Sequence, residues 1–234
     1  MTVPHDSLVH FHHELERLEQ KVLAVVDRAE QMVDMAVESV TTSNGELAAE
    51  VLEMDKAMKG TYFEIHNEWT NLMARFQPMG SDLRRMSVLL QLNITFDRMS
   101  AQCKNISRAT VENEGLPRVE RICEQVREMA DLVRPMIRTA IEAYVRRDID
   151  EARLLPAMDE PVDRMNAGMY KEAVAVGSNP SQLEWAARML LVSRALERIG
   201  DQAVDFAEQT AYLITGDRLA FEKEMSLTDH EPEA

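Results

Sequence analysis

A run of acidic residues at four-residue spacing is the part of this sequence most able to do chemistry. Glu197, Asp201 and Asp205 lie in an otherwise apolar segment whose periodicity predicts a helix. Side chains four residues apart on a helix share one face, so the three carboxylates would form a ladder. Because like charges at this spacing repel one another, we expect a metal ion or a neighbouring arginine beside them.

A second acidic pair, Asp159 and Asp163, has the same spacing in the preceding segment. If the two helices are neighbours, the two pairs converge, and their carboxylate oxygens with water suit a cation such as Mg, Mn, Fe or Zn. In the alternative interpretation, both ladders are solvated helix faces, paired with arginines such as Arg164, Arg194 and Arg198. Spacing alone favours this alternative, because acids four residues apart are common in a chain this acidic.

The elements that would position these acids are helices almost throughout. From Leu8 to Val40 the apolar residues advance by alternating threes and fours, which predicts one long amphipathic helix. Breaks rich in glycine, proline, serine or asparagine follow at 43–46, 78–81, 114–117 and 177–180. Pro156 and Pro161 should kink the segment from Asp148 to Val176 or divide it. Runs with strand-like alternation are absent, so the sequence predicts an all-α fold of six long helices.

The two halves of the chain match one another. Adding 104 to Asp55 gives Asp159, and adding 100 to Asp97 gives Glu197; the apolar positions of the first and fourth helices also coincide. We therefore predict two tandem three-helix bundles related by internal duplication, each with its own core. The predicted boundaries are 1–113 for the first repeat and 116–216 for the second, followed by an acidic, mobile tail at 217–234.

Composition narrows the class of protein. The 234 residues carry a formal net charge of −15, which argues against broad nucleic-acid binding, and 45% of them are hydrophobic, enough for a substantial core. Only Cys103 and Cys123 occur, which fits reduced thiols in the cytoplasm. No signal peptide or membrane span is evident, so we expect a soluble, intracellular protein without direct membrane insertion.

Three segments resemble the repeat signatures of the PhoU family of phosphate-signalling regulators. They are Gln77-Pro78-Met79-Gly80-Ser81-Asp82-Leu83-Arg84, Asp97-Arg98-Met99, and Arg194-Ala195-Leu196-Glu197-Arg198-Ile199-Gly200-Asp201. The resemblance runs from the opening helix to about Gly216. It includes the length, the six-helix order and the duplication as well as the motifs.

The resemblance implies a cytoplasmic, non-enzymatic regulator that forms homodimers. It would act between the ATPase subunit of the phosphate ABC transporter and a sensor histidine kinase, and would repress the phosphate-starvation response when phosphate is plentiful. The family binds divalent or trivalent metal ions through Glu/Asp-x-x-x-Asp motifs on two helices of each repeat. The second repeat keeps both motifs, Asp159 with Asp163 and Glu197 with Asp201, and Asp205 is an additional candidate one turn further on.

The first repeat departs from this pattern. Asp55 and Asp97 hold the leading acidic positions, but the residues four positions later are Lys59 and Ala101, and the counterpart of Asp205 is Asn105. Lys59 is within helical reach of Asp55, so we predict that it compensates the remaining acids in place of a metal. The resulting hypothesis is asymmetric metal binding, mainly in the second repeat.

Two other functions remain open from the sequence. One is a helical adaptor whose acids bind no ion, which metal analysis would distinguish. The other is a carboxylate-bridged metalloenzyme, against which the Glu-x-x-His signature is missing because Gly200 follows Glu197 by three. His5, His10, His12 and His13 resemble a metal cluster, but their place at the start of a helix favours a solvated terminus.

Overall fold

The computed structural model describes residues 5–177, 179–217 and 221, and every regular element in these ranges is an α-helix. The helices are α1 (His5–Leu23), α2 (Val26–Thr42), α3 (Gly45–Phe76), α4 (Ser81–Glu112), α5 (Glu120–Arg146), α6 (Ile149–Ala152), α7 (Leu155–Ala175) and α8 (Pro180–Thr215). They correspond to the six predicted helices. The first predicted helix is interrupted between α1 and α2, and the fifth is interrupted between α6 and α7. The all-α prediction is confirmed.

Local sequence explains where several helices begin. The side chains of Asn44, Asp148 and Asn179 accept hydrogen bonds from backbone N–H groups in the first turns of α3, α6 and α8. Pro156 lies in the first turn of α7, where its missing N–H has no helical partner to lose. The predicted division therefore falls just before it, whereas Pro161 lies inside the continuous helix.

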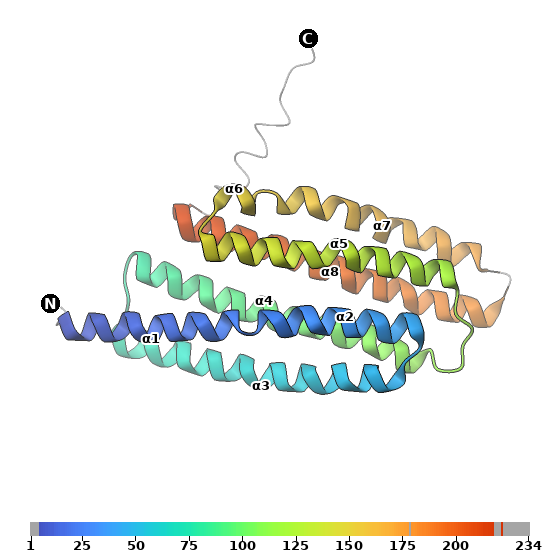
Figure 1. Cartoon of the computed structure of the whole chain (residues 1–234), viewed down its shortest axis with the longest axis horizontal. Coiled ribbons are helices and arrows are strands. Elements are labelled where there is room, and N and C mark those ends of the chain that lie inside the picture. The colour runs from blue at the N-terminus through green and yellow to red at the C-terminus, as the bar shows by residue number, and fades with distance from the viewer. Residues whose placement is uncertain (1–4, 178, 218–220, 222–234) are drawn as a thin grey trace, which may run out of the picture.

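The two repeats lie side by side along their lengths (Figure 1). The first consists of α1 to α4 and the second of α5 to α8, and the two meet where α2 contacts α5 and where α4 contacts α8. No described helix contains a stretch long and apolar enough to cross a membrane. The acidic tail predicted at 217–234 lies outside the described residues, apart from Asp217 and Phe221.

The two repeats share one core, so the prediction that each has its own is wrong. The buried hydrophobic residues of both repeats form one continuous cluster. Phe96 of α4 and Phe206 of α8 meet edge to face with ring centroids 5.8 Å apart, and Tyr144 of α5 meets Phe206 at 5.7 Å. The apolar periodicity of a helix shows which face is buried but not which helix covers it. Cys103 and Cys123 are both buried in this core and unpaired.

Polar contacts also join the repeats. Glu19 of α1 accepts hydrogen bonds from Tyr144 Oη at 2.5 Å and Arg147 Nη2 at 2.8 Å, and it forms an ion pair with Arg85. Burial raises the pKa of the Glu19 carboxyl, but the hydrogen bonds from Arg85 and Tyr144 together with the charges of Arg85 and Arg147 hold that pKa below its usual value. This network ties α1, α4 and α5 together.

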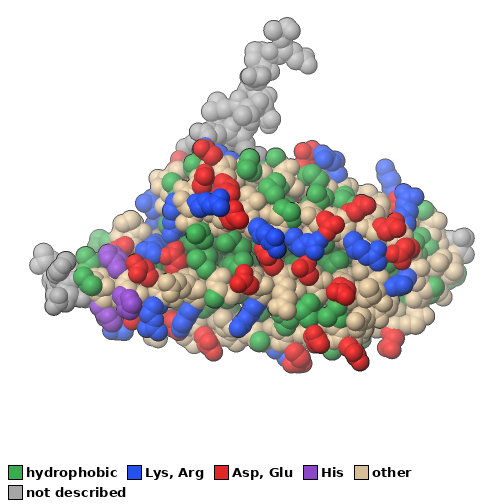
Figure 2. Space-filling model, in the orientation of Figure 1, with side chains coloured by type: hydrophobic (Ala, Val, Ile, Leu, Met, Phe, Trp, Pro, Cys, Tyr) green, Lys and Arg blue, Asp and Glu red, His purple; other side chains and the backbone are tan. Residues whose placement is uncertain are grey.

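A seam of ion pairs follows the contact of α2 with α5. Arg134 lies 2.7 Å from Asp34, and Arg138 lies 3.1 Å from Glu30. Figure 2 shows arginine and lysine side chains interleaved with acids across this face of the molecule. Because the pairs are half exposed, they contribute less to stability than the buried Glu19 network.

Candidate metal centre

Helices α7 and α8 bring three of the predicted acids together. One carboxylate oxygen of each of Asp159, Asp163 and Asp201 can be chosen so that all three lie within 4.8 Å of one another. Asp159 and Asp163 come from successive turns of α7, and Asp201 comes from the neighbouring α8. Three of the predicted acids therefore lie on the faces of α7 and α8 that meet. We refer to them below as the three-acid cluster.

Glu197 borders the three-acid cluster but has an arginine partner. Its Oε1 atom forms an ion pair with Arg194, three residues earlier on α8. Its Oε2 atom is buried and has no hydrogen-bond partner among the described residues. The charge of Glu197 also contributes to raising the pKa of Asp159, which places it beside the cluster. One oxygen of Glu197 is thus neutralised and the other is left for a further partner.

Asp205 is not brought into the cluster. Burial raises the pKa of its carboxyl, and the neighbouring charge that lowers it is Arg98 of α4. Its charge raises the pKa of Asp201, one turn earlier, but no oxygen of Asp205 belongs to the group formed by Asp159, Asp163 and Asp201. The prediction that Asp205 adds a ligand is therefore not supported by the geometry.

The cluster is electrostatically unfavourable as it stands. Asp159 is only 8% exposed, and its Oδ1 atom has no hydrogen-bond partner within the described ranges. Burial, followed by the charges of Asp163, Asp201 and Glu197, raises the pKa of Asp159 to about 7. Burial also raises the pKa of Glu197 and Asp201. Buried carboxylate oxygens without partners are costly, and a hard or borderline cation satisfies and neutralises them, so these residues fit a metal ion.

Gly200 allows this close packing. A Cβ atom at Gly200 would lie 2.5 Å from Asp159 Oδ1, so any larger residue pushes the carboxylate away from α8. In the sequence, Gly200 stands out first as the place where the histidine of a Glu-x-x-His motif is missing. Its position between Glu197 and Asp201 was the available signal, because a glycine inside a helix commonly marks a close approach.

We expect Gly200→Ala to weaken cation binding by about tenfold or more, because it displaces Asp159. Isothermal titration of the chelator-treated protein with Mn²⁺ measures this change. Gly168→Ala is the matched control, since Gly168 is also a helical glycine and its Cβ would have no neighbour within 4 Å. Equal affinities for the two variants would show that Asp159 does not need this space.

The raised pKa of Asp159 gives a pH dependence with a definite sign. Between the unfolded value near 4 and the folded value of about 7, the folded protein holds more protons than the unfolded protein. The metal-free protein should therefore lose stability relative to Asp159→Asn as pH rises from 4 to 7, with no further loss above 7. We expect a relative change of about 1–2 kcal/mol after allowing for solvent screening. Urea unfolding in chelator checks it, and parallel pH curves would contradict it.

The first-repeat acids have different partners. Lys59 Nζ donates to both carboxylate oxygens of Asp97, at 2.9 and 2.7 Å. Asp55 accepts from Lys104 Nζ at 2.6 Å and from Ser100 Oγ at 2.9 Å. Lys59 therefore pairs across to α4 with Asp97, one of the two acids that it was predicted to compensate, whereas the ion pair of Asp55 is with Lys104. Both acids have a lysine, which leaves them without the unmet charge of the second repeat.

Lys104 and Ser100 were missed by the sequence analysis. The 100-residue offset that relates Asp97 to Glu197 also relates Lys104 to Val204 and Ser100 to Gly200. Applying it to every residue of α4 would have found both. The first repeat thus replaces a hydrophobic residue by an ammonium group, and a glycine by a hydroxyl donor, beside the same acidic position.

The histidines do not form a comparable site in the described part of the chain. His12 Nε2 lies 3.1 Å from Asp82 Oδ2, and the His10 ring packs against Phe76 with centroids 5.9 Å apart. The His5 side chain lies outside the described residues. Of the residues that the structure describes, only Asp159, Asp163 and Asp201 form a group of three or more suitable metal ligands.

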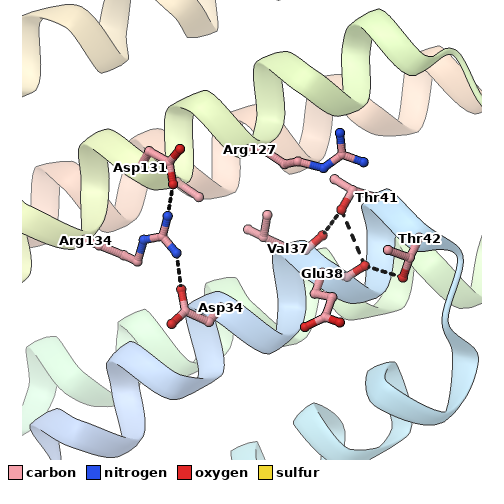
Figure 3. A pocket seen from close by; sticks show the side chains of 9 residues that line it. Asp34, Val37, Glu38, Thr41, Thr42, Arg127, Asp131 and Arg134 are labelled. Atoms are coloured by element: carbon pink, nitrogen blue, oxygen red, sulfur yellow. Dashed lines mark hydrogen bonds and ion pairs between the residues drawn. The ribbon is translucent and has the colours of Figure 1, made fainter.

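A surface hollow with a volume of about 470 Å³ lies between α2 and α5, away from the three-acid cluster (Figure 3). Arg134 extends between Asp34 and Asp131, and the hydroxyls of Thr41 and Thr42 donate to carbonyls of their own helix. Its charges are of both signs: Asp34 and Asp131 pair with Arg134, Arg127 pairs with Glu120 outside the hollow, and Glu38 is exposed to solvent. Within the described residues it lacks a buried carboxylate oxygen without a partner, such as Asp159 Oδ1 in the three-acid cluster.

Comparison with known proteins agrees with this duplicated architecture. The PhoU domain family matches the chain twice, over residues 22–110 and 126–210. A phosphate-specific transport system accessory protein PhoU homolog of Pseudomonas putida is 30% identical over 217 residues, covering 90% of this chain and 85% of that protein. The corresponding homolog of Clostridium acetobutylicum is 27% identical over 208 residues, covering 88% and 94%.

Two solved structures have the same fold. PhoU from Pseudomonas aeruginosa superposes with a TM-score of 0.82 at 29% identity, over 88% of this chain and all of that one (100%). The phosphate transport system regulatory protein PhoU from Streptococcus pneumoniae superposes with a TM-score of 0.78 at 23% identity, over 88% of this chain and 98% of that one.

Proposed function

This chain belongs to the PhoU family, and on that basis we propose that it is a cytoplasmic regulator of phosphate signalling and uptake. It acts as a metal-binding adaptor between the ATPase subunit of the phosphate ABC transporter and a sensor histidine kinase. Through these partners it represses the phosphate-starvation response when phosphate is plentiful. The relatives named as accessory proteins of the phosphate-specific transport system support this role. They also agree with the prediction that the chain is not an enzyme.

The proposal that the protein binds a metal rests on the carboxylates between α7 and α8, whose negative charges have no basic partner sufficient to neutralise them among the described residues. Asp159, Asp163 and Asp201 would hold the cation, with the free oxygen of Glu197 beside them. The cation would neutralise the carboxylates and link two helices that otherwise repel at this point. The lysine pairs of the first repeat support an asymmetric protein in which only the second repeat is metallated.

A helical adaptor without metal is the second candidate, and a specific observation favours it. Arg194 already pairs with Glu197, and the first repeat shows that this scaffold satisfies equivalent acids with basic side chains. Asp159 argues against it, because its buried Oδ1 atom is unsatisfied within the described residues. A carboxylate-bridged metalloenzyme remains the weakest candidate.

A phosphate-starvation reporter in a deletion strain tests the regulatory role. Wild type should restore repression in high phosphate, whereas the Asp163→Asn, Asp201→Asn pair should not. The control pair is Asp27→Asn, Asp150→Asn, which removes the same charge from exposed positions of α2 and α6. If the site variant represses as well as wild type, signalling does not use the cluster. If pull-downs in high and low phosphate recover neither the ATPase nor the kinase, the adaptor role is contradicted.

A further inference from the structure

A basic groove runs between α4 and α8, which lie side by side behind α2 and α5 in Figure 1. Its volume is about 330 Å³. Four arginines and one acid line it: Arg108 and Glu112 of α4, and Arg188, Arg194 and Arg198 of α8. Their formal charges give a positive groove on a chain whose net charge is −15. A local excess of this sign attracts anions against the field of the whole protein.

Two of these arginines form no close ion pair among the described residues, although the charge of Arg198 also lowers the pKa of Glu197 and Asp201. Arg108 and Arg198 are exposed, and neither has a carboxylate within 4.0 Å among the described residues. The chain has 41 acidic residues for 26 lysines and arginines, so unpaired arginines are unexpected. By contrast, Arg188 lies 2.8 Å from Glu184 on its own helix. Arg108 and Arg198 therefore form the part of the groove that is available to an anionic ligand.

The shape of the groove favours an elongated ligand. Arg188 and Arg198 are ten residues apart on α8, a length of about 15 Å. Ala109 and Ala195 line the groove and are 5% and 3% exposed, whereas Leu191, also in the lining, is 68% exposed. A single tetrahedral anion would contact one or two arginines and leave Leu191 in water. A chain of carboxylates with an apolar side chain matches the whole surface.

We propose that the α4–α8 groove is a docking site for an acidic, amphipathic peptide segment of a partner protein. Carboxylates of the segment pair with Arg108 and Arg198, and an apolar side chain covers Leu191. The inference adds the chemistry of a binding partner to the proposed function. It is testable without the metal, because Arg108 and Leu191 are not part of the three-acid cluster.

Fluorescence anisotropy with a labelled synthetic peptide tests the proposal. The probe is a glutamate-rich helix of roughly four turns with one leucine per turn, titrated with the full-length protein in chelator. We expect Arg108→Glu and Leu191→Asp each to weaken binding about tenfold, and added salt to weaken wild-type binding. Arg28→Glu and Val174→Asp are matched controls, because both residues are exposed and lie outside the groove. These two control variants should bind the peptide with the affinity of the wild type.

Several results would overturn the proposal. One is no binding by the wild type, and another is an equal loss in Arg28→Glu, which would mean that only net charge matters. Displacement of the peptide by equimolar inorganic phosphate would assign the groove to a small anion. A shift to a smaller species on size-exclusion chromatography for Arg108→Glu would assign it to a second copy of the chain. Mn²⁺ titration of the same variants separates these failures from a failure of the metal assignment.

Discussion

Saturating Mn²⁺ should raise the melting temperature of the wild-type protein by about 5–10 °C, and the Asp163→Asn, Asp201→Asn variant should not respond. A ligand at about one hundred times its dissociation constant adds about 2.7 kcal/mol to the stability of the folded state. In a chain of this size each kcal/mol corresponds to about 2–4 °C. The effect is large because the ion removes repulsion among carboxylates whose burial raises their pKa values. Differential scanning calorimetry measures it.

The first-repeat variant Asp55→Asn, Asp97→Asn is the matched control. Without metal, its stability should change in the opposite direction to that of the second-repeat variant. It should keep the Mn²⁺ response but lose stability without metal, because Lys104 and Lys59 lose their partners. The second-repeat variant should instead gain stability without metal, because it removes unfavourable charges. Equal Mn²⁺ responses in the two variants would contradict the asymmetric site.

Glu19→Ala should lower the free energy of unfolding by about 3 kcal/mol, the second large effect. Glu19 has only 12% of its side chain exposed, and its loss leaves Arg85 and the Tyr144 hydroxyl without their partner. Urea unfolding at neutral pH measures the change. Because the pKa of Glu19 is lowered in the folded state, its charge-dependent contribution is present above 4.5 and is lost as pH falls through the folded pKa.

Glu16→Ala is the control for this prediction, since Glu16 is an exposed acid one turn earlier on α1. It should change stability by less than about 0.5 kcal/mol. A similarly small change for Glu19→Ala would mean that the shared hydrophobic core alone holds the repeats together.

Much of the fold follows from local sequence. A stripe of period 3.6 specifies each helix, and a proline in a first turn specifies where α7 begins. The shared core could not be predicted in this way. Whether Phe96 faces Phe206 depends on how two helices far apart in sequence pack, and periodicity carries no information about the partner helix.

Some features of the candidate site depend on spacing within one helix and could be predicted. Others depend on contacts between helices and could not. Two acids one turn apart share a face, which is why Asp159 and Asp163 could be predicted to lie together, and the packing of α7 on α8 adds Asp201. Asp205 lies two steps of four residues beyond Glu197, so it is rotated by about 80° from it, and it is not part of the cluster. Lys59 was predicted to compensate the remaining acids from its place one turn after Asp55, and its long side chain reaches Asp97 on the neighbouring helix.

The most direct test of the asymmetric metal site is the metal content of three proteins loaded with Mn²⁺ and then gel filtered. The proteins are wild type, Asp163→Asn with Asp201→Asn, and Asp55→Asn with Asp97→Asn, all measured by elemental analysis. We predict that wild type and the first-repeat variant retain the same amount of metal, and that the second-repeat variant retains none. Retention by the second-repeat variant, or loss from the first-repeat variant, would contradict the assignment of the cation to the second repeat.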